Sequence, residues 1–233
     1  MKRHVVILGA AFGGLELSTL LSEQLADELE VTLIDQHDAF ILGFSKLDIL
    51  FRHQTRDDVR LPYRRLAKRG VVFRQETVRS IDPQRRRVGT DEATYDADVL
   101  VVALGADCDL TATPGFVEGG FEYYSVAGAE RLRDELPRFH GGKVLLAVLS
   151  IPFKCPPAPY EGILLLHDYL VGRGIRDATQ MHVVTPQPAP IPVSPEASQS
   201  TGANDGSARH RLHHASSRLR HRPCRQGGAF QRP

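Results

Sequence analysis

The feature that most constrains the fold is a glycine-rich turn near the N-terminus, set between an apolar run and an amphipathic pattern. Residues 4–8 form a short apolar run typical of a buried strand, and the turn at residues 9–14, Gly-Ala-Ala-Phe-Gly-Gly, follows directly. Leucines then recur at the spacing of one helix face: Leu17, Leu20, Leu21 and Leu25. A second apolar run at residues 31–34 ends in Asp35. This order predicts a strand–helix–strand crossover with two parallel strands.

The chemistry of this turn indicates a binding site for an adenine dinucleotide. Gly9 permits a sharp turn out of the strand, and Gly14 lets the helix approach the sheet closely. The start of a helix offers free N–H groups and the positive end of the helix dipole, which together attract a pyrophosphate. Asp35 lies about 20 residues beyond the turn, where a carboxylate can accept hydrogen bonds from both ribose hydroxyls. This arrangement favours FAD or NAD over NADP.

One position departs from the G-x-G-x-x-G pattern, because Ala11 stands where the middle glycine is expected. A methyl group near the pyrophosphate is often tolerated there. The alternative to a nucleotide site is a plain strand-to-helix turn that binds nothing. The adjoining strand, helix and terminal acid favour nucleotide binding.

Composition limits the other classes of protein. The 233 residues suffice for one large or two small domains, and 42% hydrophobic residues support a packed core. The formal net charge of +1 predicts no nucleic-acid partner. No apolar run reaches about 18 residues, the length of a transmembrane helix, and the first strand leaves no room for a signal peptide. Three scattered cysteines, Cys108, Cys155 and Cys224, predict neither disulfides nor a metal site, and a reducing, cytoplasmic location is expected.

The segment after Asp35 allows two interpretations. Residues 36–60 carry several apolar side chains around Gly43, and they either cross the cofactor or form a buried connecting helix. Residues 59–69 contain a run of basic residues and predict an exposed helix. We interpret this run as a solvated face rather than a nucleic-acid patch.

The next elements are predicted strands. Residues 71–75 predict one strand, and residues 87–90 with 93–96 predict a hairpin. Residues 97–106 predict a fully buried parallel strand that ends in a turn at Gly105. Small residues at such a turn let the backbone lie close to a cofactor.

The second half of the chain repeats the strand–helix–strand order. Residues 125–139 predict a helix, and residues 143–149 predict a strand. A helix with one apolar face follows, and residues 181–185 predict the second strand. The fold class is therefore α/β, with a parallel sheet and flanking helices.

The turn of this second unit, residues 150–161, differs chemically from the first. It contains no glycine, and three prolines in the four positions after Cys155 remove N–H groups that a phosphate would need. Cys155 lies just before a helix start and beside Lys154, and both the helix dipole and the ammonium favour the thiolate. The alternative is a buried, inert cysteine. We favour Cys155 as a catalytic residue.

Three motifs together resemble the FAD-dependent pyridine nucleotide–disulfide oxidoreductase superfamily. They are the turn at residues 9–14 with Asp35, Val-Val-Ala-Leu-Gly-Ala at residues 101–106, and Lys-Cys-Pro-Pro-Ala-Pro-Tyr-Glu at residues 154–161. The last motif is similar to that of sulfide:quinone oxidoreductases and of the flavoprotein subunit of flavocytochrome c sulfide dehydrogenase. The resemblance covers residues 1–198. It implies a Rossmann-like FAD/NAD(P)-binding fold whose second Rossmann-like domain is incomplete.

The resemblance also implies a role for each matching position. Val78 would meet the adenine edge through its backbone, and Cys155 would take up sulfide sulfur beside the flavin. The implied cofactor-binding residues are Gly9, Ala11, Gly13, Gly14, Asp35, Val78, Ala103, Leu104 and Gly105. The implied activity is FAD-dependent oxidation of sulfide or a small thiol, with quinone or a cytochrome as electron acceptor. The alternatives are a type II NADH:quinone reductase or other NAD(P)H-linked flavoprotein, and an inactive nucleotide-binding fragment.

The sequence departs from this superfamily toward its C-terminus. The partner cysteine, a late Gly-Asp motif and the elements for quinone binding or peripheral membrane association have no counterpart in these residues. The tail is rich in arginine and histidine without a packing period, which predicts disorder or a basic arm that binds nucleic acid or metal. We favour the hypothesis that a shifted reading frame replaced the family's continuation, which sequencing the locus would test. The expected domains are residues 1–110, 111–198 and the disordered tail 199–233.

Overall fold

The computed structural model describes residues 2–52, 54–187 and 210–214, with residues 194, 196, 197 and 199. The chain divides into two compact units, Met1–Leu132 and Arg133–Pro233. Each unit has a sheet and a core of its own. The division falls after Leu132, whereas the sequence predicts a boundary after residue 110.

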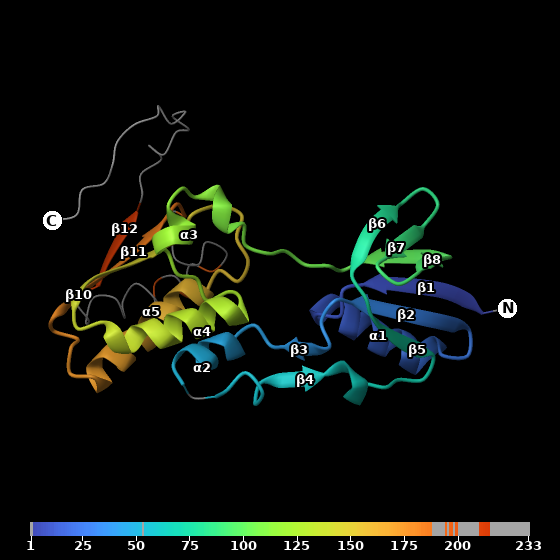
Figure 1. Ribbon diagram of the computed structural model, residues 1–233, viewed down its shortest axis with the longest axis horizontal. Coiled ribbons are helices and arrows are strands. Elements are labelled where there is room, and N and C mark those ends of the chain that lie inside the picture. The colour runs from blue at the N-terminus through green and yellow to red at the C-terminus, as the bar shows by residue number, and fades with distance from the viewer. Residues whose placement is uncertain are drawn as a thin grey trace, which may run out of the picture. The chain divides into compact units, whose positions relative to one another are not determined.

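The first unit is built on a four-stranded parallel sheet (Figure 1). Its strands are β1 (Arg3–Leu8), β2 (Leu29–Asp35), β5 (Val71–Gln75) and β9 (Val99–Val102), in the spatial order β5-β2-β1-β9. The helix α1 (Phe12–Leu25) connects β1 to β2, which confirms the predicted crossover. Because all four strands are parallel, their carboxyl ends lie at one edge of the sheet.

Side chains alternate between the two faces of this sheet, and a different layer covers each face. One face packs against Leu15, Leu17 and Leu21 of α1 through Val5, Ile7, Val31 and Leu33. The other face packs through Val6, Leu8 and Ile34 against the antiparallel strands β6 (Val78–Asp82), β7 (Arg87–Thr90) and β8 (Thr94–Asp96). Figure 1 shows α1 and the β6–β8 layer on opposite sides of β1 and β2. Burial on both faces explains why β1 and β2 are continuous apolar runs, and the hairpin is confirmed.

Two burial predictions in the first unit are wrong. β9 pairs in parallel with β1 as expected, but it is not fully buried, because Val99 is 46% and Val102 60% exposed. The reason is that β9 forms an edge of the sheet in the described part of the chain, whereas β1 is central. Leu20 is 41% exposed, since the sheet contacts its neighbours Leu17 and Leu21 instead.

The predicted exposed helix over residues 59–69 is also wrong. The segment between β2 and β5 forms β3 (Ala39–Ile41), α2 (Ser45–Leu50), β4 (Arg60–Pro62) and the 3-10 turn η1 (Tyr63–Arg65), with β3 and β4 antiparallel. Proline lacks an N–H and biases the residue before it toward extended conformations, so Pro62 ends a strand here. The buried connecting helix is present as α2, and passage of this segment across a cofactor stays a prediction.

A series of short helical elements follows β9. They are η2 (Leu110–Ala112), α3 (Phe116–Gly119), α4 (Val126–Glu135) and η3 (Leu136–Arg138). The predicted helix over residues 125–139 is thus confirmed as α4 extended by η3. Ala129 and Leu136 of this segment are buried.

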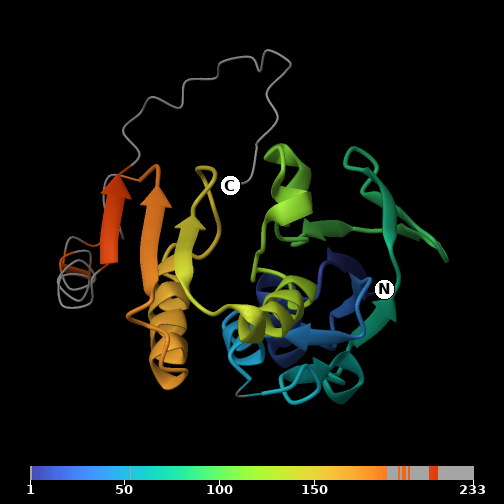
Figure 2. The same ribbon diagram turned by 60° about the vertical axis from the view of Figure 1, so that its left-hand side comes forward.

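The second unit contains the second predicted strand–helix–strand crossover. The strands β10 (Gly142–Ala147) and β11 (Thr179–Thr185) are parallel, and the helix α5 (Ala158–Gly172) connects them. Figure 2 shows their arrows side by side, with α5 alongside. The helix packs on the sheet through Tyr160, Ile163 and Leu170 against Met181 and Val183. The expected α/β, Rossmann-like fold is confirmed.

The tail contributes one further strand. β12 (His210–His214) pairs in parallel with β11, so these five residues depart from the expected disorder. Most of the remaining tail lies outside the described residues. None of the helices in the described residues is long and apolar enough to cross a membrane.

Leu170→Ala tests the core of the second unit. Leu170 is fully buried between α5 and the sheet, so its truncation should lower the free energy of unfolding by about 2–5 kcal/mol. The matched control is Leu164→Ala on the same helix, where the side chain is 39% exposed and the expected loss is below about 1 kcal/mol. Urea unfolding followed by circular dichroism measures both. Equal losses would contradict the packing described for α5.

Candidate functional site

The turn that follows β1 brings three strand ends together. Gly9 has a φ of +95°, and its N–H donates to the carbonyl oxygen of Ile34 at 2.7 Å. A Cβ on Gly9 would lie 2.4 Å from the carbonyl oxygen of Ala103, just beyond β9. Both the left-handed conformation and the lack of space therefore require glycine at this position.

The last glycine of the turn is required for a different reason. A Cβ on Gly14 would lie 1.8 Å from the carbonyl oxygen of Gly9, so no side chain fits between the first turn of α1 and the end of β1. At Gly13 an added Cβ would meet only the Ala103 side chain at 3.8 Å, an ordinary contact. The predicted close approach of helix and strand is thus located at Gly14.

The first turn of α1 has the features of an anion site. Ala11 precedes the helix in an extended conformation, and no side chain caps the helix start. The first intrahelical bond of the turn runs from the Leu15 N–H to the Ala11 carbonyl oxygen at 2.9 Å. The N–H groups ahead of Leu15 have no such partner within an α-helix, and Ala11 and Gly13 are exposed. Glycine backbone and uncapped N–H groups fit a pyrophosphate.

Asp35 lies where the sequence predicts an acceptor for ribose. One carboxylate oxygen, Oδ2, accepts from the Ala10 N–H at 2.7 Å, and Oδ1 accepts from the His37 N–H at 2.8 Å. A carboxylate can accept about four hydrogen bonds, so capacity remains for ribose hydroxyls. The side chain therefore joins the end of β2 to the glycine turn while staying partly exposed.

Of the remaining predicted cofactor-binding residues, Ala103, Leu104 and Gly105 follow β9 at the same edge of the sheet, and Val78 belongs to β6. Ala103 donates its N–H to the Leu8 carbonyl oxygen at 2.8 Å, and Leu104 follows with 52% exposure. Val78 packs against the cluster that contains Leu8. Gly105 has a φ of +74°, but no atom lies within 4 Å of an added Cβ, so only its conformation favours glycine.

Tyr63 belongs to this site although the sequence reasoning missed it. Its hydroxyl donates to the carbonyl oxygen of Ala10 at 2.7 Å, and the side chain is only 5% exposed. Burial raises the pKa of the Tyr63 phenol well above its ordinary value, and the charges of Asp35 and Asp38 raise it further. The group is therefore a protonated donor near neutral pH. A tyrosine inside the basic run of residues 59–69 is the only sequence signal for it.

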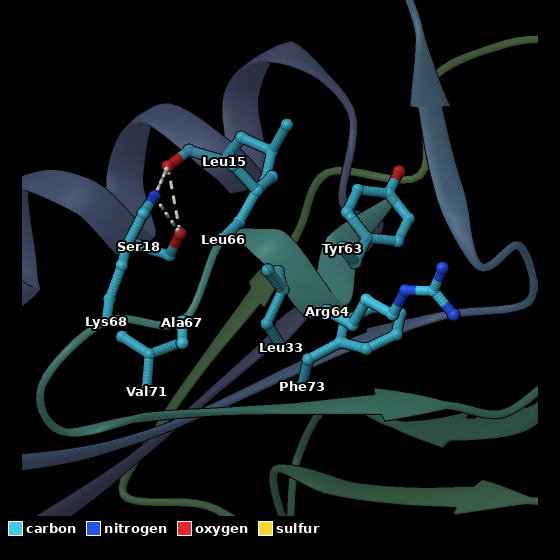
Figure 3. A pocket seen from close by; sticks show the side chains of 10 residues that line it. All are labelled: Leu15, Ser18, Leu33, Tyr63, Arg64, Leu66, Ala67, Lys68, Val71 and Phe73. Carbon is cyan, nitrogen blue, oxygen red and sulfur yellow. Dashed lines mark hydrogen bonds between the residues drawn. The ribbon is translucent and has the colours of Figure 1, made fainter. Parts of the chain in front are cut away.

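A small cavity lies beside Tyr63 on the face of the sheet that α1 covers (Figure 3). Its volume is about 160 Å³, and it is lined by Leu15, Ser18, Leu33, Tyr63, Arg64, Leu66, Ala67, Lys68, Val71 and Phe73. Figure 3 shows the Tyr63 hydroxyl pointing away from Leu33 and Phe73. None of the predicted cofactor-binding residues lines this cavity, so it is separate from the glycine turn.

Cys155 belongs to the second unit and lies in the loop from β10 to α5, as predicted. It is partly buried, with a φ of +57° that is unusual for a residue with a side chain. Its carbonyl oxygen accepts from the Ala158 N–H at 3.0 Å, at the first residue of α5. The thiol-bearing residue is thus held in a strained turn just ahead of the helix start. Among the described residues, no three side chains of metal-binding type form a cluster.

Comparison with known proteins assigns the family. The sequence profile of the pyridine nucleotide-disulphide oxidoreductases matches residues 3–148, which is more than half of the chain. The chain belongs to this family. The match covers the glycine turn, Asp35 and the 101–106 segment. Members of the family are FAD-binding flavoproteins, in agreement with FAD as the expected cofactor.

Curated relatives match the first part of the chain. A type II NADH:quinone oxidoreductase of Staphylococcus saprophyticus is 30% identical over 133 residues, which cover 56% of this chain and 33% of the relative. A demethylphylloquinone reductase of Synechocystis sp. is 31% identical over 147 residues, covering 58% and 36%. The chain therefore spans about a third of the length of these relatives.

Solved structures share the fold over most of the chain. The sulfide:quinone oxidoreductase of Aquifex aeolicus has a TM-score of 0.82 at 24% identity, covering 91% of this chain and 51% of that one. The NDH2 of Plasmodium falciparum in complex with NADH has a TM-score of 0.69 at 15% identity, covering 92% and 48%. These likenesses support the fold of both units.

Gly14→Ala tests the close approach of helix and strand. The added methyl group would overlap the Gly9 carbonyl oxygen, so we expect a loss of about 3 kcal/mol or more in the free energy of unfolding. Gly13→Ala is the matched control, one residue away with space for a Cβ, and should change stability by less than about 1 kcal/mol. Thermal and urea unfolding measure both. A Gly14→Ala variant as stable as Gly13→Ala would show that the turn has a different geometry.

Proposed function

We propose that this chain is the FAD-binding and sulfur-accepting part of a flavoprotein that oxidises sulfide or a small thiol. The glycine turn would hold the FAD pyrophosphate and Asp35 the adenosine ribose. Electrons would pass to quinone or a cytochrome. Bound FAD supplies the two-electron acceptor that side chains lack, and the residues of the chain position sulfur and nucleotide.

The single observation that carries the sulfide assignment is the chemistry of residues 150–161. A nicotinamide-binding crossover needs glycine and free N–H groups in this loop to approach a pyrophosphate. Here three prolines follow Cys155 within four positions, and each lacks an N–H. Cys155 stands at the carboxyl end of β10, just before α5, where a ligand of a parallel sheet normally binds. This loop favours a sulfur nucleophile over a second dinucleotide.

In the proposed chemistry, Cys155 forms a disulfide with a cysteine supplied from outside these 233 residues. Hydrosulfide attacks one sulfur, the S–S bond breaks, and a persulfide and a thiolate result. A small thiol then takes the outer sulfur of this persulfide as its own persulfide, which leaves two cysteine thiolates. These thiolates would pass two electrons to bound FAD, and the S–S bond would form again. Cys155 is the one residue of this chain to which we assign a covalent step.

A second candidate function is NADH oxidation of the type II NADH:quinone reductase kind. The curated relatives at 30% identity carry that name, and their similarity lies in the first part of the chain. That part holds the adenosine and pyrophosphate groups in either function, so it does not distinguish them. A third possibility is a fragment that binds nucleotide without turnover.

The visible spectrum and reductive bleaching of the purified protein separate these functions. We expect bound flavin to give its visible absorption. In protein that also carries the partner cysteine, we expect this absorption to be lost on anaerobic mixing with sulfide, and not with NADH. Bleaching by NADH alone would favour the second function. Absence of flavin after incubation with FAD would favour the inactive fragment.

Cys155→Ser tests the sulfur-accepting residue. We expect sulfide-dependent bleaching to slow by about 10³-fold or more, because the attacking or accepting sulfur is lost. FAD content should stay unchanged, since Cys155 belongs to the second unit and the glycine turn to the first. Cys108→Ser is the control, a substitution of an exposed cysteine that should leave the rate unchanged. Unaltered bleaching in Cys155→Ser would remove Cys155 from the mechanism.

A further inference from the structure

We infer that Tyr63 is a positioning residue for the pyrophosphate turn, acting through the peptide group between Ala10 and Ala11. This inference rests on the proposed FAD site and adds a residue from a distant segment to it. It starts from two hydrogen bonds that hold Ala10 from opposite ends. The Ala10 N–H donates to Asp35 Oδ2 and the Ala10 carbonyl oxygen accepts from the Tyr63 hydroxyl, both at 2.7 Å.

These two bonds fix the direction of successive N–H groups. In a trans peptide the carbonyl and the following N–H point in opposite directions. Because Tyr63 draws the Ala10 carbonyl into the interior, the N–H of Ala11 is turned the other way, toward the exposed start of α1. The same rule explains the neighbouring peptide: the Ala10 N–H points to Asp35, and the Gly9 carbonyl points toward Gly14.

The tyrosine is itself held rigidly. Its backbone N–H donates to the Asp38 carbonyl oxygen at 3.0 Å, just before β3. Its ring packs against Phe73 of β5 at 4.7 Å between centroids. The pairing of β3 with β4 carries the chain to this point. The hydroxyl therefore has a defined direction, because residues 36–62 position Tyr63 with its hydroxyl facing the glycine turn.

Removing the hydroxyl leaves a buried acceptor without its donor. Ala10 is fully buried, so its carbonyl oxygen would lose a hydrogen bond that water does not readily replace. The peptide group between Ala10 and Ala11 can then rotate, and the Ala11 N–H no longer has a fixed direction. Tyr63 does not contact the nucleotide in this account, and it acts through the turn.

The test compares Tyr63→Phe with Tyr95→Phe. The control removes an equally short hydrogen bond, from the Tyr95 hydroxyl to Glu76 at 2.7 Å, in the same unit but outside the turn. Tyr63→Phe should raise the Kd for FAD about tenfold. It should shift the ³¹P resonances of the bound pyrophosphate and, without FAD, the amide resonance of Ala11. Tyr95→Phe should leave all three readouts unchanged.

The outcomes distinguish this inference from the proposed function. Protein with unaltered sequence that binds no FAD would overturn both. FAD binding with the same Kd and the same ³¹P spectrum in Tyr63→Phe would overturn the role of Tyr63 alone. A Tyr63→Phe protein that does not fold, or the same ³¹P shift in Tyr95→Phe, would make the hydroxyl a general structural element and would also overturn that role.

Discussion

The structure of the first unit depends on one backbone contact, between the peptide at the end of β1 and the first turn of α1. With no Cβ on Gly14, the helix starts directly over the Gly9 carbonyl oxygen. That approach sets the position of α1 above the sheet, and Leu15, Leu17 and Leu21 then reach Ile7 and Leu33. Packing of these side chains supplies the stability, but the glycine contact decides which face they bury. A single methyl group on Gly14 would push α1 away from the sheet, and both the packing of its leucines and the position of the anion site would change.

The same turn is completed by groups that are distant in sequence. Asp35 is 25 residues from Ala10 and Tyr63 is 53 residues away, yet both bond to that one residue. A local motif can therefore form a strand and a helix by itself, but the direction of its N–H groups depends on β2 and on the segment before β5. This dependence explains why a glycine pattern alone is weak support for nucleotide binding, and why the residues around the turn are needed to complete the site.

The sequence predicts the elements whose physics is local. Apolar runs at residues 4–8 and 31–34 indicate strands because burial on both faces leaves few polar positions, and the glycine turn fixes what joins them. Predictions fail where contacts between distant segments decide the local structure. Residues 59–69 carry helix-forming residues, but pairing with β3 makes their start a strand. Tyr63 could not be found because nothing in its neighbours shows that its hydroxyl faces residue 10. The exposure of β9 depends on its place at the sheet edge, which no local pattern reports.

The two crossovers of this chain have the same strand–helix–strand topology and differ in the chemistry of the loop between the first strand and the helix. In each, a strand leads into a helix whose start can stabilise a negative charge. The first crossover uses glycines there, so that backbone N–H groups face outward and a diffuse, two-phosphate charge fits. The second has prolines there, which lack an N–H group, and Cys155 adopts a left-handed conformation before α5. That loop therefore presents side chains in place of backbone N–H groups, and Cys155 is the residue for which we propose sulfur chemistry. Loop composition, rather than fold, therefore separates dinucleotide binding in one unit from the sulfur chemistry proposed for the other.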